Sequence, residues 1–316
     1  MDKGSGTSVQ GEMVVQEFIH MLTIQGELTP KTLKEYASDL KHFTEWYKGN
    51  DSRGEESSFH IEDVHTSTLV RYREDSQKVM QLKPSTINRR LITLKRFFKW
   101  AASESSFNSD PSKPLKFIPE DKVSPRRMTT EEERSFISAV EDGNSLRDQT
   151  ILTLMFHTGL RTMEVCNLAP SDIELGKRSG QLTVRADKRN GQRKISLNMT
   201  CIALLKMYMT GLAPDSPYLF PSEKTSDRLT ERALRHLIKK VMTSAGLEGL
   251  SSHDLRHRFG YAMAEHTPLH RLAEMMGHIN PDTTMIYVKG LNANLSSSAE
   301  EDGETEPQLK YMQHSL

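Results

Sequence analysis

The sequence predicts a mainly α-helical protein with a small antiparallel β-sheet in its second half. Apolar residues recur at helical spacing through the first hundred residues, whereas alternating apolar residues occur only between about 173 and 197. A proline-rich segment over residues 108–127 interrupts the periodicity. Because 316 residues are enough for one or two domains, we expect a helical N-terminal domain followed by an α+β domain.

The first hundred residues are predicted to form a leader and four helices. Residues 1–11 are small and polar, which is typical of a flexible leader. Apolar residues spaced three and four apart predict helices over residues 12–22, 29–47, 66–78 and 85–101. We expect these helices to pack into one domain spanning residues 12–107.

The fourth helix is the most basic element of the chain. Its segment from Lys83 to Lys99 holds six positive residues and no acid, although Lys plus Arg equals Asp plus Glu over the whole chain. A solvated helix face would have the same composition. The alternative is contact with DNA phosphates, whose counterions each bound cation helps to release. The candidate DNA-binding residues are Lys83, Arg89, Arg90, Lys95, Arg96 and Lys99.

The second half is predicted to mix helices with short strands. Residues 108–127 contain four prolines and are expected to link the domains. Thr129 and Glu132 form a capping-box pattern near the start of the next domain, residues 128–292. Predicted helices cover residues 146–156, 201–209, 231–245, 251–263 and 269–276, and predicted strands lie near 173, over 181–185 and over 194–197, with a turn at 188–191. The acid-rich residues 293–316 are expected to form a tail.

Candidate catalytic side chains gather within residues 251–289. His253 and Arg256 are three apart in a predicted helix. Helix geometry would therefore place the imidazole and the guanidinium on one face, where they could grip one anion together.

Two further candidates follow in the same segment. His278 comes directly after Gly277, a residue suited to the left-handed conformation that ends helices. The Asn-Pro pair at 280–281 is then predicted to begin a helix that carries Tyr287. A phenol is thus expected near two imidazoles and an arginine.

The order of these residues resembles a known family. His-x-x-Arg, then Gly-His, then Tyr nine residues on resembles the C-terminal signature of the tyrosine recombinases, which include phage integrases and Xer-type resolvases. Upstream, residues 158–164 resemble the family's first arginine box and residues 187–191 its hairpin lysine. Residues 32–43, 86–91 and 97–100 are similar to its SAM-like core-binding domain.

The resemblance implies a site-specific recombinase that cleaves and rejoins double-stranded DNA through a 3′-phosphotyrosyl intermediate and a Holliday junction. It implies a dimer on one recombination site and a tetramer in the synapse, for integration, excision or resolution. The implied catalytic residues are Arg161, Lys188, His253, Arg256, His278 and Tyr287, with Glu164 orienting its neighbours from outside contact with the phosphate.

These residue types suit the cleavage of a phosphodiester. The guanidinium groups of Arg161 and Arg256 stay charged and match two phosphate oxygens, and the two histidines can donate hydrogen bonds or shuttle protons near neutral pH. Tyr287, as the nucleophile, needs nearby cations because the pKa of a phenol is ordinarily about 10. That Lys188 protonates the leaving oxygen follows from the resemblance alone.

The sequence also indicates what the protein does without. We find no acidic triad suited to magnesium and no Gly-rich phosphate loop, so we predict no metal, no ATP and no other cofactor. Cys166 and Cys201 cannot form a disulfide framework, which indicates a reducing cytoplasm. No apolar run approaches the roughly 18 residues of a membrane span, so no membrane partner is expected.

Two other functions remain open from the sequence. A type IB topoisomerase-like enzyme would relax DNA with similar residues, although the Xer-like N-terminal helices disfavour it. A DNA-binding architectural protein without catalysis is disfavoured by the complete set of candidate residues. The sequence does not distinguish a phage, a transposon or another mobile element from a chromosomal role, and it does not reveal the target DNA.

Overall fold

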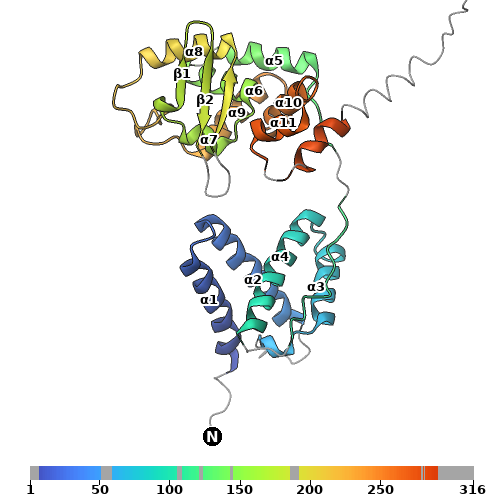
Figure 1. The fold of residues 1–316 in the computed structure, drawn as a ribbon. Helices are drawn as coiled ribbons and strands as arrows, with labels where there is room; N and C mark the ends of the chain where they lie inside the picture. Colours follow the sequence, from blue (N-terminus) through green and yellow to red (C-terminus); the bar gives the residue numbers. More distant parts are fainter. Residues whose placement is uncertain are drawn as a thin grey trace, which may run out of the picture. The chain divides into compact units, whose positions relative to one another are not determined.

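The computed structural model describes residues 7–50, 59–104, 109–120, 124–142, 145–185, 192–278, 280 and 282–290, with side chains from Gly11 onward. The chain forms two compact units, Met1–Lys122 and Val123–Leu316 (Figure 1). In the parts of the chain that are described, no helix combines the length and apolar character needed to cross a membrane.

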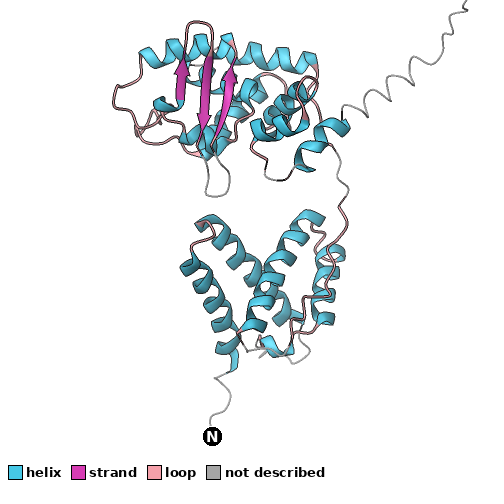
Figure 2. Ribbon diagram, in the orientation of Figure 1, coloured by secondary structure: helices cyan, strands magenta, loops and turns pink. Residues whose placement is uncertain are grey.

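The first unit is helical, as predicted (Figure 2). Its elements are α1 (Thr7–Gln25), α2 (Pro30–Asn50), the 3₁₀ helix η1 (Ile61–Asp63), α3 (Thr66–Lys78) and α4 (Pro84–Ser103). The apolar residues at helical spacing form its core, in which the Phe43 ring meets the rings of Tyr72 and Phe98 edge to face. Aromatic pairs of this kind add to the stabilisation that burial of their surface provides.

Two boundaries of the first unit differ from the sequence prediction. Helix α1 begins at Thr7, so residues 7–11 are helical although we expected a leader there. The reason is tertiary: Gly11 packs against the backbone of Phe59, where an added Cβ would lie 1.9 Å from the carbonyl oxygen. Part of the expected linker also belongs to this unit, because Leu115 is buried in its core.

The second unit combines helices with one three-stranded sheet, which confirms the predicted fold class (Figure 2). Its elements are α5 (Thr130–Glu141), α6 (Leu146–Thr158), α7 (Thr162–Asn167), η2 (Pro170–Asp172), β1 (Ile173–Leu175), β2 (Gly180–Val184), β3 (Arg193–Leu197), α8 (Met199–Thr210), α9 (Glu231–Ser244), α10 (Ser252–Ala264) and α11 (Leu269–Met276). Residues 282–290 are also helical.

The sheet is antiparallel throughout, in the order β1-β2-β3. The predicted strands agree with β2 and β3 to within a residue or two. The expected hairpin turn, with Lys188, lies outside the described residues.

Helix α6 is the centre of the second unit, since α5, α8, α10 and β3 all pack against it. Gly159 ends α6 and Gly277 ends α11, both in the left-handed conformation (φ 62° and 61°). A Cβ at Gly277 would lie 2.8 Å from Nη1 of Arg193. Glycine at this turn thus lets a guanidinium reach the end of α11.

Candidate functional site

Three arginines converge on the C-terminal end of α11, where residues 275–277 present consecutive carbonyl groups. Arg193 Nε donates to the first at 2.9 Å, Arg256 Nη2 donates to the second, and Arg161 Nη2 donates to the third at 2.9 Å. The last carbonyls of a helix lack intrahelical partners and carry the negative end of its dipole. The helix end therefore gathers side chains from α10, β3 and the start of α7.

A single carboxylate lies among these arginines in the described part of the chain. Glu164 accepts two hydrogen bonds from Arg193, at 2.9 and 2.8 Å, and one from Arg161 Nη1 at 2.9 Å. Burial alone would raise the pKa of Glu164, but the hydrogen bonds and charge of Arg193, followed by Arg161, lower it. Three cations against one anion leave a positive excess, and Arg161, whose side chain is 40% exposed, can present it to an incoming anion.

Arg256 is the most deeply held of the three, with 6% of its surface exposed. Its Nη1 donates to the carbonyl of Gly159 at 2.6 Å. Burial, and next the charge of Arg161, lower the pKa of Arg256 to about 10. The guanidinium remains charged at neutral pH, and an anion placed between it and Arg161 would relieve their repulsion.

Tyr287 projects from the helical segment 282–290 into a slot beside this cluster and is 1% exposed. The floor of the slot is Gly260, where an added Cβ would lie 2.5 Å from Cζ of the phenol. The Tyr261 ring meets the phenol edge-on at 5.2 Å, and the His278 ring stacks on it at 6.4 Å. Burial raises the pKa of Tyr287 to about 12, against the opposing charge of Arg256. The phenol is therefore protonated and shielded from solvent.

The start of the second unit also holds the segment around Tyr287. Ser124 Oγ donates to the carbonyl of Ile286 at 3.2 Å, and the Tyr261 hydroxyl donates to the carbonyl of Pro125 at 2.6 Å. Residues 124–125 thus brace both the helical segment that carries Tyr287 and one wall of its slot.

The predicted histidines differ in their surroundings. Nδ1 of His278 lies 2.9 Å from Thr284 Oγ1, and burial together with the charges of Arg256 and Arg161 lowers the pKa of His278 to about 4. This imidazole is therefore neutral at pH 7, whereas the sequence suggested a group that gains and loses protons near that pH. His253 is exposed in the first turn of α10, and the structure does not bring its imidazole into a hydrogen bond with another described residue.

Sequence reasoning missed two residues of the cluster. Arg193 starts β3, and the alternation with the buried Ile195 and Leu197 was a signal that its side chain faces inward. His257, directly after Arg256, has Nδ1 at 3.1 Å from the Tyr287 hydroxyl. Nothing in the local sequence distinguishes His257 from other helix histidines, because its partner lies 30 residues away.

The predicted DNA-binding residues of α4 divide into two groups. Arg89 donates to the buried Asp39 at 2.6 Å, and Nε of Arg90 lies 3.8 Å from the same carboxylate. Lys95 donates to the carbonyl of Ser112 at 2.6 Å, and Arg96 lies 3.6 Å from Glu27. Lys83 and Lys99 are exposed. Several of these cations therefore hold the helical unit together, a role that the charge pattern did not reveal.

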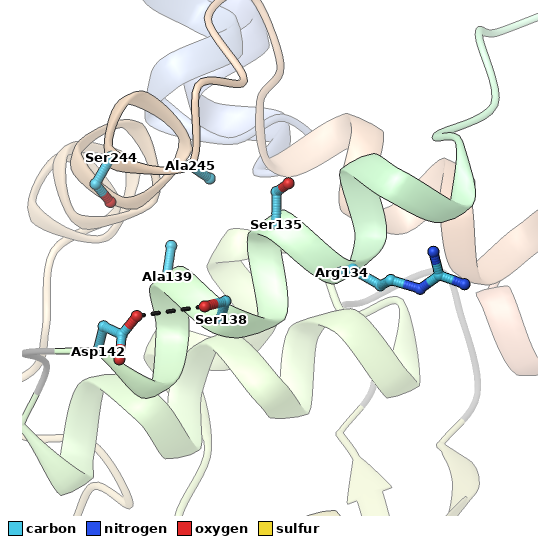
Figure 3. A pocket seen from close by; sticks show the side chains of 7 residues that line it. All are labelled: Arg134, Ser135, Ser138, Ala139, Asp142, Ser244 and Ala245. Atoms are coloured by element: carbon cyan, nitrogen blue, oxygen red, sulfur yellow. Dashed lines mark hydrogen bonds between the residues drawn. The ribbon is translucent and has the colours of Figure 1, made fainter.

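Two hollows of the second unit lie outside the arginine cluster. One, of about 450 Å³, lies between α5 and the end of α9, and the seven residues that line it are labelled in Figure 3. Another, of about 510 Å³, is lined in part by Arg235, Lys239 and His253. The described residues contain no group of three His, Cys, Asp or Glu side chains placed to hold a metal ion, and metal independence stays a prediction.

Comparison with known families agrees with this architecture. The pattern of the phage integrase family matches residues 126–293, more than half of the chain. The chain belongs to the phage integrase family. The N-terminal SAM-like domain of phage integrases matches residues 15–105, which lie in the helical first unit.

Relatives of this integrase-family chain include tyrosine recombinases over most of its length. Tyrosine recombinase XerC of Staphylococcus epidermidis is 25% identical over 292 residues, which cover 90% of this chain and 95% of that protein. Tyrosine recombinase XerA of Pyrococcus furiosus is 30% identical over 220 residues, which cover 68% of this chain and 73% of that protein.

Solved structures confirm the fold. XerH site-specific recombinase bound to a palindromic difH substrate aligns with a TM-score of 0.72 at 20% identity, over 93% of this chain and 84% of that one. The Tn1549 transposon integrase in complex with circular intermediate DNA aligns with a TM-score of 0.67 at 20% identity, over 89% and 98%. The predicted combination of a SAM-like domain and a tyrosine-recombinase catalytic domain is confirmed.

Proposed function

We propose that this protein is a site-specific DNA recombinase that cleaves DNA strands through a 3′-phosphotyrosyl intermediate. The observation that carries the proposal is the convergence of Arg161, Arg193 and Arg256 beside the phenol of Tyr287. The names of the relatives, tyrosine recombinases of the Xer group, support the same reaction.

The proposed roles follow from the chemistry of each side chain. Arg161 and Arg256 bind the two non-bridging oxygens of the scissile phosphate and stabilise the charge of the pentavalent state. Tyr287 attacks phosphorus, and Lys188 protonates the leaving 5′ oxygen. His253 and His278 donate hydrogen bonds to the phosphate, whose charge would raise the pKa of His278 from about 4. Glu164 keeps Arg161 in place without touching the phosphate.

The proposed assembly is a dimer on one site and a tetramer that joins two sites and exchanges strands through a Holliday junction. A covalent phosphotyrosyl bond conserves the energy of the broken bond, so exchange needs no ATP, and the arginines take the place of a metal. The cytoplasm is the proposed location, since Cys166 and Cys201 are free thiols.

A nicked suicide substrate tests this function. Duplexes that the protein selects from a random-sequence library are nicked near the bound centre and incubated with wild-type protein, and a covalent adduct is expected on a denaturing gel. Tyr287→Phe should bind the same DNA and form no adduct, while Tyr261→Phe tests whether the neighbouring phenol is the nucleophile instead. An adduct that persists in Tyr287→Phe would remove that residue from the role.

Excess EDTA should leave adduct formation intact, and loss of the adduct with recovery on adding magnesium would contradict the metal-free mechanism.

The other two candidate functions, a topoisomerase and an architectural protein, give different results in the same assays. A topoisomerase would relax plasmids that lack the selected site, and an architectural protein would bind without any adduct.

A further inference from the structure

The phenol of Tyr287 must lose a proton as it attacks phosphorus, and none of the proposed catalytic residues has been assigned to accept that proton. Tyr287 is buried, so bulk water does not reach its hydroxyl. Nδ1 of His257 lies 3.1 Å from the phenol oxygen, within hydrogen-bond distance. We infer that His257 is the catalytic base that receives the Tyr287 proton as the phenol attacks phosphorus, an inference that rests on the proposed function.

The geometry favours His257 over the two predicted histidines. The His278 ring lies nearly parallel to the phenol, with 13° between the planes, and its Nδ1 is taken by Thr284. His253 is exposed at the start of α10. His257 lies one turn further along α10, level with the slot whose floor is Gly260, and its ring is tilted at 54° to the phenol. Within the described residues, the phenol oxygen is hydrogen-bonded to this imidazole alone.

The charges around His257 suit a neutral base. Burial lowers the pKa of His257, Asp254 raises it, and His253 and Arg256 lower it again. A neutral imidazole has one unprotonated nitrogen, which can accept the phenol proton. The imidazolium formed in the step would be stabilised by Asp254 and by the added negative charge of the pentavalent phosphate.

The step balances in both directions. As the Tyr287 oxygen bonds to phosphorus, its proton passes to His257 Nδ1, the bond from phosphorus to the 5′ oxygen breaks, and Lys188 supplies the proton for that oxygen. In strand joining, the incoming 5′ hydroxyl loses its proton to Lys188, and the imidazolium returns its proton to the departing phenol oxygen. The same pair therefore serves cleavage and rejoining.

The test is single-turnover cleavage of the nicked suicide substrate by His257→Ala and His257→Asn, each checked for folding by thermal melting. Asparagine can accept a hydrogen bond from the phenol but cannot take its proton. Both variants should bind DNA normally and cleave about 10²–10⁴-fold more slowly. Their rates should rise about tenfold per pH unit as phenolate forms, and added imidazole should speed His257→Ala. His266→Ala, whose side chain is 80% exposed, is the matched control.

A substrate with sulfur in the 5′ bridging position separates base from acid, because its leaving group needs no proton. The His257 variants should remain slow on it, and recovery to the wild-type rate would assign His257 to the leaving group instead. A wild-type cleavage rate in His257→Asn would limit the imidazole to a hydrogen-bonding role and overturn the inference. A wild-type cleavage rate in His257→Ala would also overturn it. Wild-type protein that forms no Tyr287 adduct would overturn the proposed function as well.

Discussion

Helix α4 and the end of α11 both gather arginines, yet the two regions use positive charge differently. In the first unit, Arg89 and Arg90 face one buried carboxylate, Asp39, while Arg96 lies beside Glu27. In the second unit, Arg161 and Arg193 share the carboxylate of Glu164, and they and Arg256 also donate to helix-end carbonyls. Three cations against one carboxylate leave the larger excess of positive charge in the second arrangement, whereas Arg89 and Arg90 face Asp39 as two against one.

A basic run in a sequence therefore shows how many positive charges a segment carries, but not how many of them are free to bind a ligand. An arginine that neutralises a buried acid contributes mainly to folding, since the acid would otherwise be an uncompensated buried charge. An arginine held by neutral carbonyl dipoles keeps its full charge for a ligand.

Arg193→Met should destabilise the second unit by about 3–5 kcal/mol, because it breaks a buried, doubly hydrogen-bonded pair with Glu164. Arg89→Met should cost about 1 kcal/mol or less, since Arg89 is 45% exposed and Asp39 keeps its bond from Thr93. Urea unfolding measures both changes. Adding Glu164→Gln to Arg193→Met should recover part of the stability, and equal destabilisation in the two single variants would contradict the comparison.

Arg161→Ala should slow cleavage of the nicked substrate by about 10²–10³-fold, the cost of removing one donor to a developing charge. Arg89→Ala should leave the rate at saturating protein within about twofold, because its guanidinium is engaged by Asp39. Single-turnover cleavage rates of the two variants on the same nicked substrate check both expectations. A similar decrease in rate in both variants would mean that α4 contributes to the chemistry.

Lys83→Ala combined with Lys99→Ala should flatten the salt dependence of DNA binding, by about 0.9 in slope for each phosphate that the variant no longer neutralises. Lys83, at the N-cap of α4, and Lys99, within it, are both exposed, so the melting temperature should not change. Arg89→Ala with Arg90→Ala, in contrast, should lower the melting temperature as well. An unchanged slope in the lysine variant would assign the basic helix to folding and solubility alone.

The neutral state of His278 should appear as a pH dependence of stability. The folded pKa of about 4 is below the ordinary value of about 6.5, so the unfolded chain binds the proton more readily between these values. Unfolding free energy should therefore fall as pH drops from 6.5 towards 4. The melting temperature of His278→Gln should fall less than that of wild type between pH 7 and 5 in the absence of DNA, and parallel decreases would contradict this.

The features that the sequence predicted correctly are local. Apolar spacing gave the helices, the Thr129 and Glu132 pattern gave the capping box at α5, and alternation gave β2 and β3. Gly277 ends α11 in the left-handed conformation as expected. Asn280 also caps the next helical segment, since its Oδ1 accepts from the backbone N–H of Asp282 at 2.9 Å.

The sequence by itself determined most of the long helices and the strands, because these depend on neighbours within about one or two turns of chain. It also indicated the family, because the order of the motifs along the chain can be read without the fold. Only the tertiary structure decided which charges are paired and which side chains surround Tyr287. Arg193 meets Glu164 across 29 residues and the end of α11 across 82, and His257 meets Tyr287 across 30. Side-chain pairing at such separations is set by how helices and strands pack. The periodicity within one segment does not predict which residue of another segment its side chains will contact.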